Sequence, residues 1–238
     1  MNLNKISIVI LAGGLGTRLK DFRGTNTEKV LLEINGTPMI IKQIGQVLDW
    51  GFNIDNIVCV TNPNIHDSIQ KVNRDKFGSR IKYVTQPEQL GIAHAFSFAE
   101  DKISSEQILL VLGDNFFEKN PFQKKEMESE DISNIFIKSV ENPEDFGVAE
   151  VEGGRIVSLE EKPVNPKSNL AVVGLYLYKS DIFSKIKTLK PSKRGELEIT
   201  DLNKKLIEEG SLTYHEIDGW WIDAGTPERI VELESKID

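Results

Sequence analysis

Cysteine and histidine are scarce in this chain of 238 residues. Its one cysteine, Cys59, lies in a strand-like run and can form no internal disulfide, so we interpret it as a buried structural thiol. The three histidines, His66, His94 and His215, show no metal-ligand spacing and no triad with a serine. A disulfide framework, a histidine metal centre and covalent catalysis by cysteine or serine are therefore disfavoured.

Long hydrophobic runs and a basic surplus are also absent. No apolar run approaches the roughly 20 residues that a membrane-spanning helix needs. Residues 1–5 lack the apolar core and cleavage site of a signal peptide, so we expect a cytoplasmic protein without a membrane partner. The formal net charge of −8, without a basic block, disfavours nucleic-acid binding. An excess of carboxylates is still compatible with a divalent metal beside phosphates.

A glycine-rich loop is the most informative feature that is present. Residues 8–19 read Ile-Val-Ile-Leu-Ala-Gly-Gly-Leu-Gly-Thr-Arg-Leu, an apolar strand-like run followed by glycines and Arg18. Glycines let backbone N–H groups approach a phosphate, and arginine adds a permanent charge. The loop is no dinucleotide fingerprint, because Leu19 replaces the third glycine, and no P-loop, because Thr17-Arg18 follows Gly16. It predicts a phosphate-bearing ligand, with a simple tight turn as the alternative.

Strand-like and helical segments alternate through the first half of the chain. The predicted strands are 6–11, 56–61, 81–85 and 107–112, and the predicted helices are 38–50, 65–74 and 91–102. This alternation predicts an α/β fold, Rossmann-like, with a mainly parallel sheet flanked by helices. Ligands of such sheets bind beyond the carboxyl ends of strands. Both the glycine loop and Gly113-Asp114 fall there.

The second half has a different pattern. Segments 135–140, 147–152 and 155–160 predict consecutive antiparallel strands, the last two joined at Gly153-Gly154. The remaining predicted strands are 171–178, 211–217 and 220–222, and the predicted helices are 181–187, 198–209 and 227–236. We expect one continuous domain over 1–238, with a nucleotide half of about 1–115 and a second-ligand half of about 116–238.

Isolated acids and a lysine near strand ends carry the candidate chemistry. Asp114 and Asp223 each follow an apolar run and precede small or polar residues, which suits Mg²⁺ binding beside phosphates as well as a capping or turn role. Glu161 and Lys162 are suited to sugar hydroxyls and a phosphate, with a surface charge cluster as the alternative. With Arg18 and Lys29, they favour phosphoryl or nucleotidyl transfer.

Further segments follow the glycine loop in a fixed order: Glu-Lys-Val-Leu-Leu (28–32), Gln-Pro-Glu-Gln-Leu-Gly-Ile-Ala-His-Ala (86–95), Val-Leu-Gly-Asp-Asn (111–115), Phe-Gly-Val-Ala-Glu (146–150), Ser-Leu-Glu-Glu-Lys-Pro (158–163), Pro-Lys-Ser-Asn-Leu-Ala-Val-Val-Gly-Leu-Tyr (166–176), Arg-Gly-Glu-Leu-Glu-Ile-Thr-Asp-Leu-Asn (194–203) and Trp-Ile-Asp-Ala-Gly-Thr (221–226). Together with 11–19, these segments cover nearly the whole chain. In this order the chain resembles the sugar-phosphate nucleotidylyltransferases, in particular the glucose-1-phosphate thymidylyltransferases.

The resemblance implies a nucleotide-diphospho-sugar transferase fold and transfer of a nucleotidyl group to a sugar 1-phosphate, with release of pyrophosphate. It implies that the nucleotide contacts Leu11, Ala12, Gly13, Gly14, Gly16, Thr17, Arg18, Gln86 and Gly91. It places the sugar phosphate against Gly147, Glu161, Lys162 and Val173. It assigns catalysis to Arg18, Lys29, Asp114 and Asp223, the two aspartates as Mg²⁺ ligands.

Several alternatives stay open at this point. The resemblance favours dTTP or UTP, and glucose 1-phosphate, over CTP, GTP or another sugar 1-phosphate. A non-catalytic nucleotide-sugar-binding regulatory protein on the same fold is the rival from another class. Glu28 beside Lys29 departs from the family pattern and is expected to weaken the local positive field. A homo-oligomer is compatible with the sequence.

Overall fold

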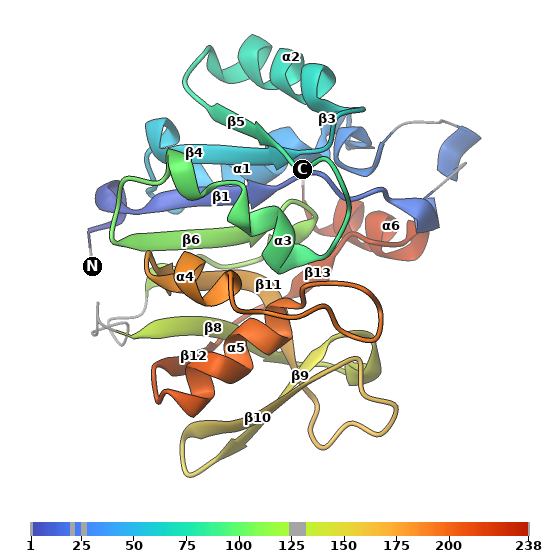
Figure 1. Cartoon of the computed structure of the whole chain (residues 1–238). Coiled ribbons are helices and arrows are strands. Elements are labelled where there is room, and N and C mark those ends of the chain that lie inside the picture. The colour runs from blue at the N-terminus through green and yellow to red at the C-terminus, as the bar shows by residue number, and fades with distance from the viewer. Residues whose placement is uncertain (1, 20–21, 25–27, 124–131, 238) are drawn as a thin grey trace.

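A computed structural model describes residues 2–19, 22–24, 28–123 and 132–237. Its main sheet contains β1 (Ser7–Leu11), β4 (Ile57–Thr61), β5 (Lys82–Thr85), β6 (Gln107–Leu112), β8 (Ser133–Ser139), β9 (Gly147–Glu152), β10 (Arg155–Glu161), β11 (Leu170–Lys179) and β12 (Leu212–Glu216). The nine strands follow the order β10-β9-β11-β6-β1-β4-β5, with β8 paired to β11 and β12 paired to β8. The predicted mixed sheet is confirmed (Figure 1).

The four strands β6, β1, β4 and β5 are parallel and form the part of the sheet that carries the glycine loop. Ile8, Val9 and Ile10 of β1 are each fully buried, as expected for a strand covered on both faces. Cys59 lies at the same depth in β4, and burial raises the pKa of its thiol to about 12. The interpretation of Cys59 as a buried thiol is confirmed.

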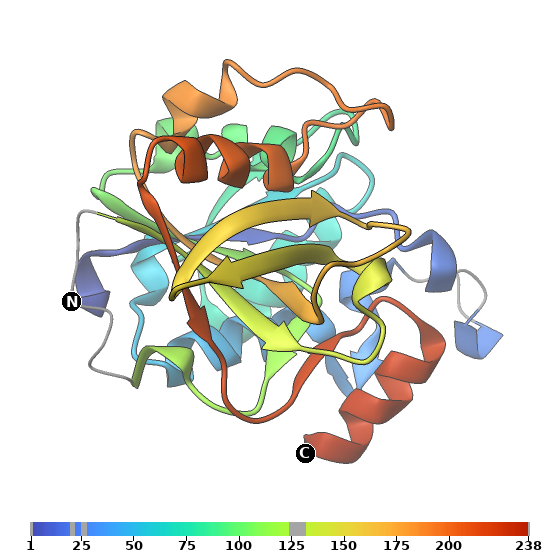
Figure 2. The same cartoon turned by 90° about the horizontal axis from the view of Figure 1, so that it is seen from below.

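Helices cover both faces of the sheet. The helices are α1 (Met39–Asp49), α2 (His66–Phe77), α3 (Ile92–Ser97), α4 (Ile182–Ile186), α5 (Ile199–Glu208) and α6 (Pro227–Lys236). Apolar residues of α1 and α2 pack with Ile8 and Ile10, whereas those of α3, α4 and α5 pack with Val9. Successive side chains of β1 therefore enter opposite cores, with α4 and α5 on one side and α1 on the other (Figure 2).

The second half departs from the predicted order of neighbours. The β9–β10 hairpin forms as expected, but β8 is not beside β9. It pairs with β11 in antiparallel and β12 in parallel orientation. The long strand β11 pairs with β8 along one edge, where the register shifts between Val172 and Tyr176. Along its other edge, β11 pairs with β9 near its start and with β6 over Leu175–Lys179.

Three short strands were not predicted from the sequence. β2 (Glu33–Ile34) and β3 (Thr37–Pro38) form a small hairpin, and β7 (Asn115–Phe117) pairs with β13 (Trp221–Asp223). The predicted helix 91–102 is shorter than expected, because after Ser97 the chain tightens into a 3-10 turn at Glu100–Lys102. None of the helices in the described ranges is long and apolar enough to cross a membrane.

Candidate active site

Two adjoining cavities lie at the carboxyl ends of the parallel strands. The first has a volume of ≈ 300 Å³ and is lined by Leu11, Gly13, Gly14, Gly16, Lys29, Val30, Gln86, Gln89, Gly91, Ile92, Ala95, Leu112, Asp114 and Glu196. The second, of ≈ 170 Å³, is lined on its polar side by Asn115, Asp145, Glu161, Lys162, Arg194, Glu196, Glu198, Thr200 and Asp223. Both cavities are lined by Ile92, Leu112 and Glu196, so ligands in the two would lie against each other.

A larger polar hollow, of ≈ 900 Å³, lies at the opposite end of the sheet. It borders Ser7 and Gln107, the first residues of β1 and β6. Ligands of parallel α/β sheets bind at the carboxyl ends of the strands, where loops can change without disturbing the core. The two adjoining cavities therefore form the better candidate site, although neither is the largest hollow.

The glycine loop needs glycine at two positions for different reasons. A Cβ atom on Gly13 would lie 3.1 Å from the carbonyl carbon of Thr61, so the loop passes directly over the end of β4. Gly16 has φ +58°, and a Cβ atom there would lie 2.6 Å from Cβ of Lys29. The Asn62 side-chain amide donates a 2.9 Å hydrogen bond to the Gly13 carbonyl and fixes the loop. The loop is thereby held open toward the first cavity.

Not every residue expected to contact the nucleotide lines the first cavity. Leu11, Gly13, Gly14, Gly16, Gln86 and Gly91 do so. The side chain of Ala12 is fully buried in the core, and Ala12 does not line this cavity. Thr17 and Arg18 are exposed at the start of a 3-10 turn, outside the cavity wall. Arg18 still acts electrostatically on the site. Its charge lowers the pKa values of Lys29 and Asp223, although other effects are stronger and both pKa values are raised overall.

Lys29, Asp114 and Asp223 meet where the two cavities join. The Lys29 ammonium donates a hydrogen bond to Oδ2 of Asp114 and lies 4.0 Å from Oδ1 of Asp223. Asp114 lines the first cavity and Asp223 the second. Lys29 and Asp114 are 85 positions apart in the sequence, yet the fold brings them together with Asp223 into one cluster.

Pairing of β7 with β13 holds the two aspartates in place. In this pair Asp223 lies opposite Asn115, and the Ala224 N–H donates to the Asp114 carbonyl at 2.8 Å. Asn115 links three elements through its side chain. The side-chain nitrogen Nδ2 donates to Asp114 Oδ1 at 2.7 Å, and the side-chain oxygen Oδ1 accepts from Trp221 Nε1 at 2.7 Å and from the Gly174 N–H at 3.2 Å. Asn115 was not singled out from the sequence, because only the short β7–β13 pairing reveals its role.

The two aspartates have opposite pKa shifts. Burial acts to raise the pKa of Asp114, but the charge and hydrogen bond of Lys29 outweigh it and the pKa is lowered. Burial and then the neighbouring Asp114 charge raise the pKa of Asp223 to about 6, against the opposing charges of Lys29, Arg18 and Lys162. Burial also disfavours charged Lys29, yet the two carboxylates raise its pKa. Lys29 and Asp114 are therefore a stable ion pair, and Asp223 is under-neutralised.

Asp223 has the properties of a partly satisfied metal ligand. Its Oδ1 is buried and accepts no hydrogen bond from any residue in the described ranges. Mg²⁺ is commonly held by one or two carboxylates together with substrate phosphates and water. Within the described part of the chain no cluster of three or more candidate metal-ligating side chains occurs, so a cation held by the two aspartates would need further oxygen ligands, such as those of a phosphate. The residues present fit a divalent cation that arrives with a nucleotide.

The expected sugar-phosphate residues mostly line the second cavity. Gly147, Glu161 and Lys162 do so, whereas Val173 packs in the core on the opposite face of β11. Val172 lines the cavity, whereas Val173 does not, and a contact of Val173 with a sugar phosphate stays a prediction. Lys162 has φ +44°, a left-handed conformation that a non-glycine residue adopts at a cost. Such strain is typical of positions where the backbone aims a functional side chain.

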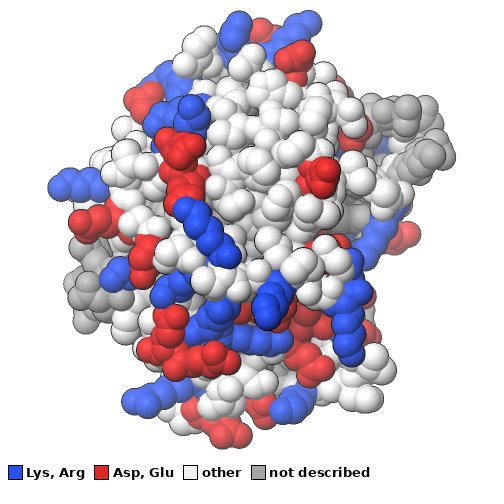
Figure 3. Space-filling model, viewed as in Figure 1, with Lys and Arg blue, Asp and Glu red and all other residues white. Residues whose placement is uncertain are grey.

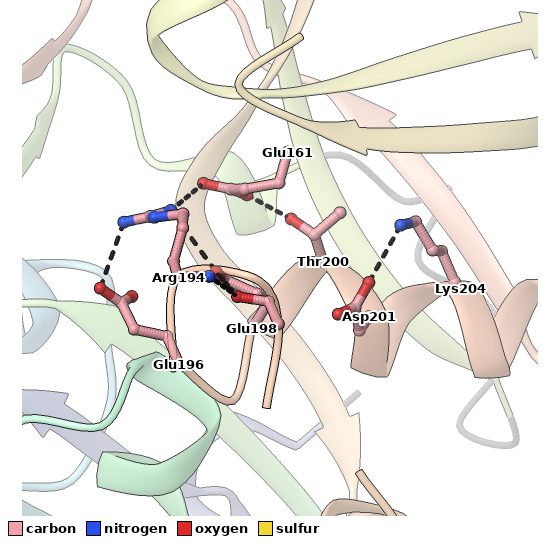
Figure 4. Close-up of polar contacts among 8 residues, drawn as sticks. Glu161, Arg194, Glu196, Glu198, Thr200, Asp201 and Lys204 are labelled. Carbon is pink, nitrogen blue, oxygen red and sulfur yellow. Dashed lines mark hydrogen bonds and ion pairs between the residues drawn. The ribbon is translucent and has the colours of Figure 1, made fainter. Parts of the chain in front are cut away.

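Arg194 and its acidic neighbours are a group that the sequence reasoning did not assign. The Arg194 guanidinium lies 3.5 Å from Glu161, 3.2 Å from Glu196 and 3.5 Å from Glu198 (Figure 4). Thr200 donates a 2.5 Å hydrogen bond to Glu161 from the other side. The sequence signal for this group is the alternation of acids after the arginine, at Glu196 and Glu198. Glu161 joins them because it is the last residue of β10, which ends beside the loop that carries Arg194. The cluster places one more cation in the second cavity.

Charges of both signs are interspersed on the face shown in Figure 3. Lys and Arg stand beside Asp and Glu in its lower part, around α5, and most of its upper middle is uncharged. This face therefore shows no large patch of one charge sign.

Comparison with known proteins agrees with this geometry. The model of the nucleotidyl transferase family matches residues 7–238. The chain belongs to this family. Glucose-1-phosphate thymidylyltransferase of Neisseria meningitidis is 41% identical over 95% of this chain and 81% of its own length. The low-salt glycan biosynthesis nucleotidyltransferase Agl11 of Haloferax volcanii is 36% identical over 96% of this chain and 65% of its own length.

Solved structures extend the likeness of this nucleotidyl transferase to three dimensions. A crystal structure from Bacillus anthracis, described as a glucose-1-phosphate thymidylyltransferase in complex with sucrose, has a TM-score of 0.87 and 37% sequence identity. The match covers 98% of this chain and 96% of that one. A nucleotide-diphospho-sugar transferase fold is thus confirmed for the whole sheet, including the antiparallel part where sequence reasoning misplaced β8.

Proposed function

We propose that this nucleotidyl transferase joins the nucleotidyl group of a nucleoside triphosphate, dTTP or UTP in the first place, to a sugar 1-phosphate such as glucose 1-phosphate. The products are a nucleoside diphosphate sugar and pyrophosphate. The observation that carries the proposal is the position of Lys29, Asp114 and Asp223 at the junction of two cavities. The names of the relatives that the chain matches support the substrate classes.

The proposal divides the chain into a nucleotide half of about 1–115 and a sugar-phosphate half of about 116–238 within a single domain. The first cavity is built almost wholly from the first half, with Glu196 as the exception. Most of the second cavity comes from the second half. The glycine loop and Gln86 would hold the nucleotide, and Glu161 and Lys162 the sugar phosphate.

The reaction needs no covalent enzyme intermediate. An oxygen of the sugar phosphate attacks the α-phosphorus in line, and the bond from that phosphorus to the pyrophosphate oxygen breaks, so its electron pair leaves on pyrophosphate. The attacking oxygen is already anionic, and no general base is required. Lys162 offsets the charge of the acceptor phosphate, Lys29 contacts the α-phosphate, and Arg18 receives the leaving group from the rim. Positioning and charge stabilisation supply the rate enhancement.

A divalent cation, Mg²⁺ in the first place, fits this proposal. Asp114 and Asp223 would hold it, because Asp223 keeps a buried oxygen without a hydrogen bond in the described ranges. When bound, the cation would neutralise phosphate charge and orient the triphosphate. Lys29 keeps Asp114 ionised in its absence and so preserves one ligand in its binding form.

Release of pyrophosphate tests the proposal directly. The protein with MgCl₂ is incubated with each of dTTP, UTP, CTP, GTP and ATP, paired with glucose 1-phosphate and a panel of other sugar 1-phosphates. We expect release to require both substrates and to be fastest with dTTP or UTP and glucose 1-phosphate. Binding of nucleotide sugars without release from any pair would instead favour a regulatory, non-catalytic protein.

A further inference from the structure

Gln86 and His94 form a polar pair at the far end of the first cavity. Gln86 directly follows β5, the edge strand, and its N–H donates to the Thr61 carbonyl at 2.8 Å. Its side chain is almost fully buried and lines the cavity. The Gln86 amide nitrogen lies 3.0 Å from Nδ1 of His94 on α3. The proposed function uses Gln86 as a nucleotide contact but gives His94 no role.

The sheet places this pair where the base of a nucleotide would lie. Asp114 follows β6, the glycine loop follows β1, and Gln86 follows β5, which is three strands from β6. Neighbouring strands are about 4.8 Å apart, so Gln86 is about 14 Å from the phosphate end along the sheet edge. That span is of the size of an extended nucleotide. A nucleotide whose phosphates lie beside Lys29 would therefore place its base beside the side-chain amide of Gln86.

The structure places the amide nitrogen of Gln86, rather than its oxygen, beside His94. An amide nitrogen can only donate, so Nδ1 of His94 accepts and the imidazole proton lies on Nε2. The amide oxygen of Gln86 accepts no hydrogen bond from the described residues, and it is the group left to face the cavity. The opposite amide orientation would bring two acceptors to 3.0 Å unless the His94 proton moved to Nδ1. Amide orientation and histidine tautomer are therefore coupled.

His94 itself is firmly held. Its ring packs edge-on against Phe98 with centroids 5.0 Å apart. The helix α3 begins after Gly91, whose φ is +102° and where a Cβ atom would lie 2.6 Å from the Leu197 carbonyl oxygen. The Ala93 N–H donates to the same carbonyl at 3.2 Å. The helix that carries His94 is thus fixed against the chain segment beside it.

We infer that His94 is a positioning residue that selects uracil or thymine over cytosine by fixing the Gln86 amide with its oxygen toward the base. Uracil and thymine carry a donor at N3 beside carbonyl acceptors, which matches an amide oxygen beside an amide N–H. Cytosine carries an acceptor at N3 and a donor at N4, which meets the same amide with like groups. A site that pairs polar groups rejects a base that leaves them unpaired.

The test compares two substitutions that differ in one property. His94→Phe keeps a ring against Phe98 but removes the acceptor, whereas His94→Asp keeps an acceptor close to the Nδ1 position and offers no donor. Dissociation constants for UTP and CTP are measured by calorimetry on wild type and both variants, in MgCl₂ and without sugar phosphate. The preference for UTP, called here the UTP-to-CTP ratio, is the affinity for UTP divided by the affinity for CTP. We expect wild type and His94→Asp to prefer UTP. We expect this ratio to be about tenfold smaller in His94→Phe than in wild type.

A Gln86→Ala background separates positioning from a structural effect. If His94 acts through Gln86, then His94→Phe leaves the UTP-to-CTP ratio unchanged in that background. His215→Gln on β12, whose ring contacts Asn134 away from the cavities, is the control histidine change. The inference is overturned by wild type binding UTP and CTP alike, or by His94→Phe weakening both equally.

Binding and turnover are read separately, because the inference deepens the proposed function. Pyrophosphate release with glucose 1-phosphate is measured on the same proteins. A wild type that prefers UTP in binding but releases no pyrophosphate with any sugar phosphate refutes the proposed transfer and leaves base selection by His94 standing. Turnover with an unchanged UTP-to-CTP ratio in His94→Phe refutes only the role of His94.

Discussion

Lys29 lies between two carboxylates whose pKa values move in opposite directions. Its ion pair with Asp114 lowers the pKa of that carboxyl despite burial, whereas burial and the charge of Asp114 raise the pKa of Asp223 to about 6. Glu28, expected to weaken the field at Lys29, is not among the described charges that shift the lysine. The residue that most needs a counter-charge is therefore Asp223, and a cation bound with a nucleotide supplies it.

Asp223→Asn should reduce pyrophosphate release by roughly 10²–10³-fold, because a neutral amide cannot replace a charged ligand beside the phosphates. The fold should be intact, since Asp223 Oδ1 makes no hydrogen bond within the described ranges. Steady-state rates and a circular dichroism spectrum measure the two effects. Activity near that of wild type at saturating MgCl₂ would remove Asp223 from the site.

The same substitution should stabilise the metal-free protein by about 1 kcal/mol at pH 7.5, a modest figure because water screens a side chain that is 36% exposed. The folded-state pKa of about 6 exceeds the ordinary value of 3.8. The favourable contribution of protonated Asp223 is thus complete below pH 3.8 and lost as pH rises through about 6.

Thermal melts in EDTA from pH 5 to 8 measure this effect. The difference between Asp223→Asn and wild type should widen as pH rises through about 6 and then level off. Addition of MgCl₂ and nucleotide should stabilise wild type more than the variant. A variant that is less stable than wild type at pH 7.5 in EDTA would contradict the charge argument.

Gly16→Ala should cost about 1–2 kcal/mol of stability and displace Lys29. The φ of +58° disfavours alanine, and the new Cβ would lie 2.6 Å from Cβ of Lys29. Gly14→Ala is the matched control, because nothing lies within 4 Å of its Cβ position. Urea unfolding of both variants measures the difference, and equal midpoints would show that the loop conformation does not depend on Gly16.

At the scale of elements, the short β7–β13 pair controls the geometry of the site. It joins the end of β6 to a segment more than a hundred residues later, and Trp221 of β13 donates to Asn115 of β7. One residue, Asn115, thereby connects both short strands with β11. Strands too short to be predicted from periodicity thus position both aspartates.

Asn115→Ala should destabilise the protein by about 3 kcal/mol, because it leaves the buried Trp221 indole N–H and the Gly174 N–H without their acceptor. It should also lower turnover, since Asp114 loses a hydrogen bond that orients it. Chemical denaturation and pyrophosphate release measure both. Trp221→Phe, which removes only one donor, is the control and should cost less than Asn115→Ala.

At the scale of the whole molecule, the two cavities predict separable substrate binding. Lys162→Ala should raise the KM for the sugar phosphate by about tenfold or more and leave the dissociation constant of the nucleotide almost unchanged. Gln86→Ala should have the reverse effect. Calorimetry with nucleotide alone and steady-state kinetics against sugar phosphate distinguish them. A Lys162→Ala variant that weakens only nucleotide binding would refute the division into two halves.

Local patterns in the sequence determined much of this molecule. The apolar run before the glycine loop, the alternation of strands with amphipathic helices and the Gly153-Gly154 turn each predicted an element that is present. These signals are local, because burial periodicity and turn geometry depend on neighbouring residues. The ordered motifs then identified the family, and the carboxyl-end rule located Asp114 and the glycine loop at one edge.

Only the tertiary structure decided which distant residues meet. It set β8 beside β11, turned Val172 rather than Val173 into the cavity, and surrounded Arg194 with acids from two segments. It also joined His94 to Gln86 and left Oδ1 of Asp223 without a hydrogen bond in the described ranges. Register, strand bends and long-range pairing fix such contacts, and a one-residue change of register exchanges the faces of a strand.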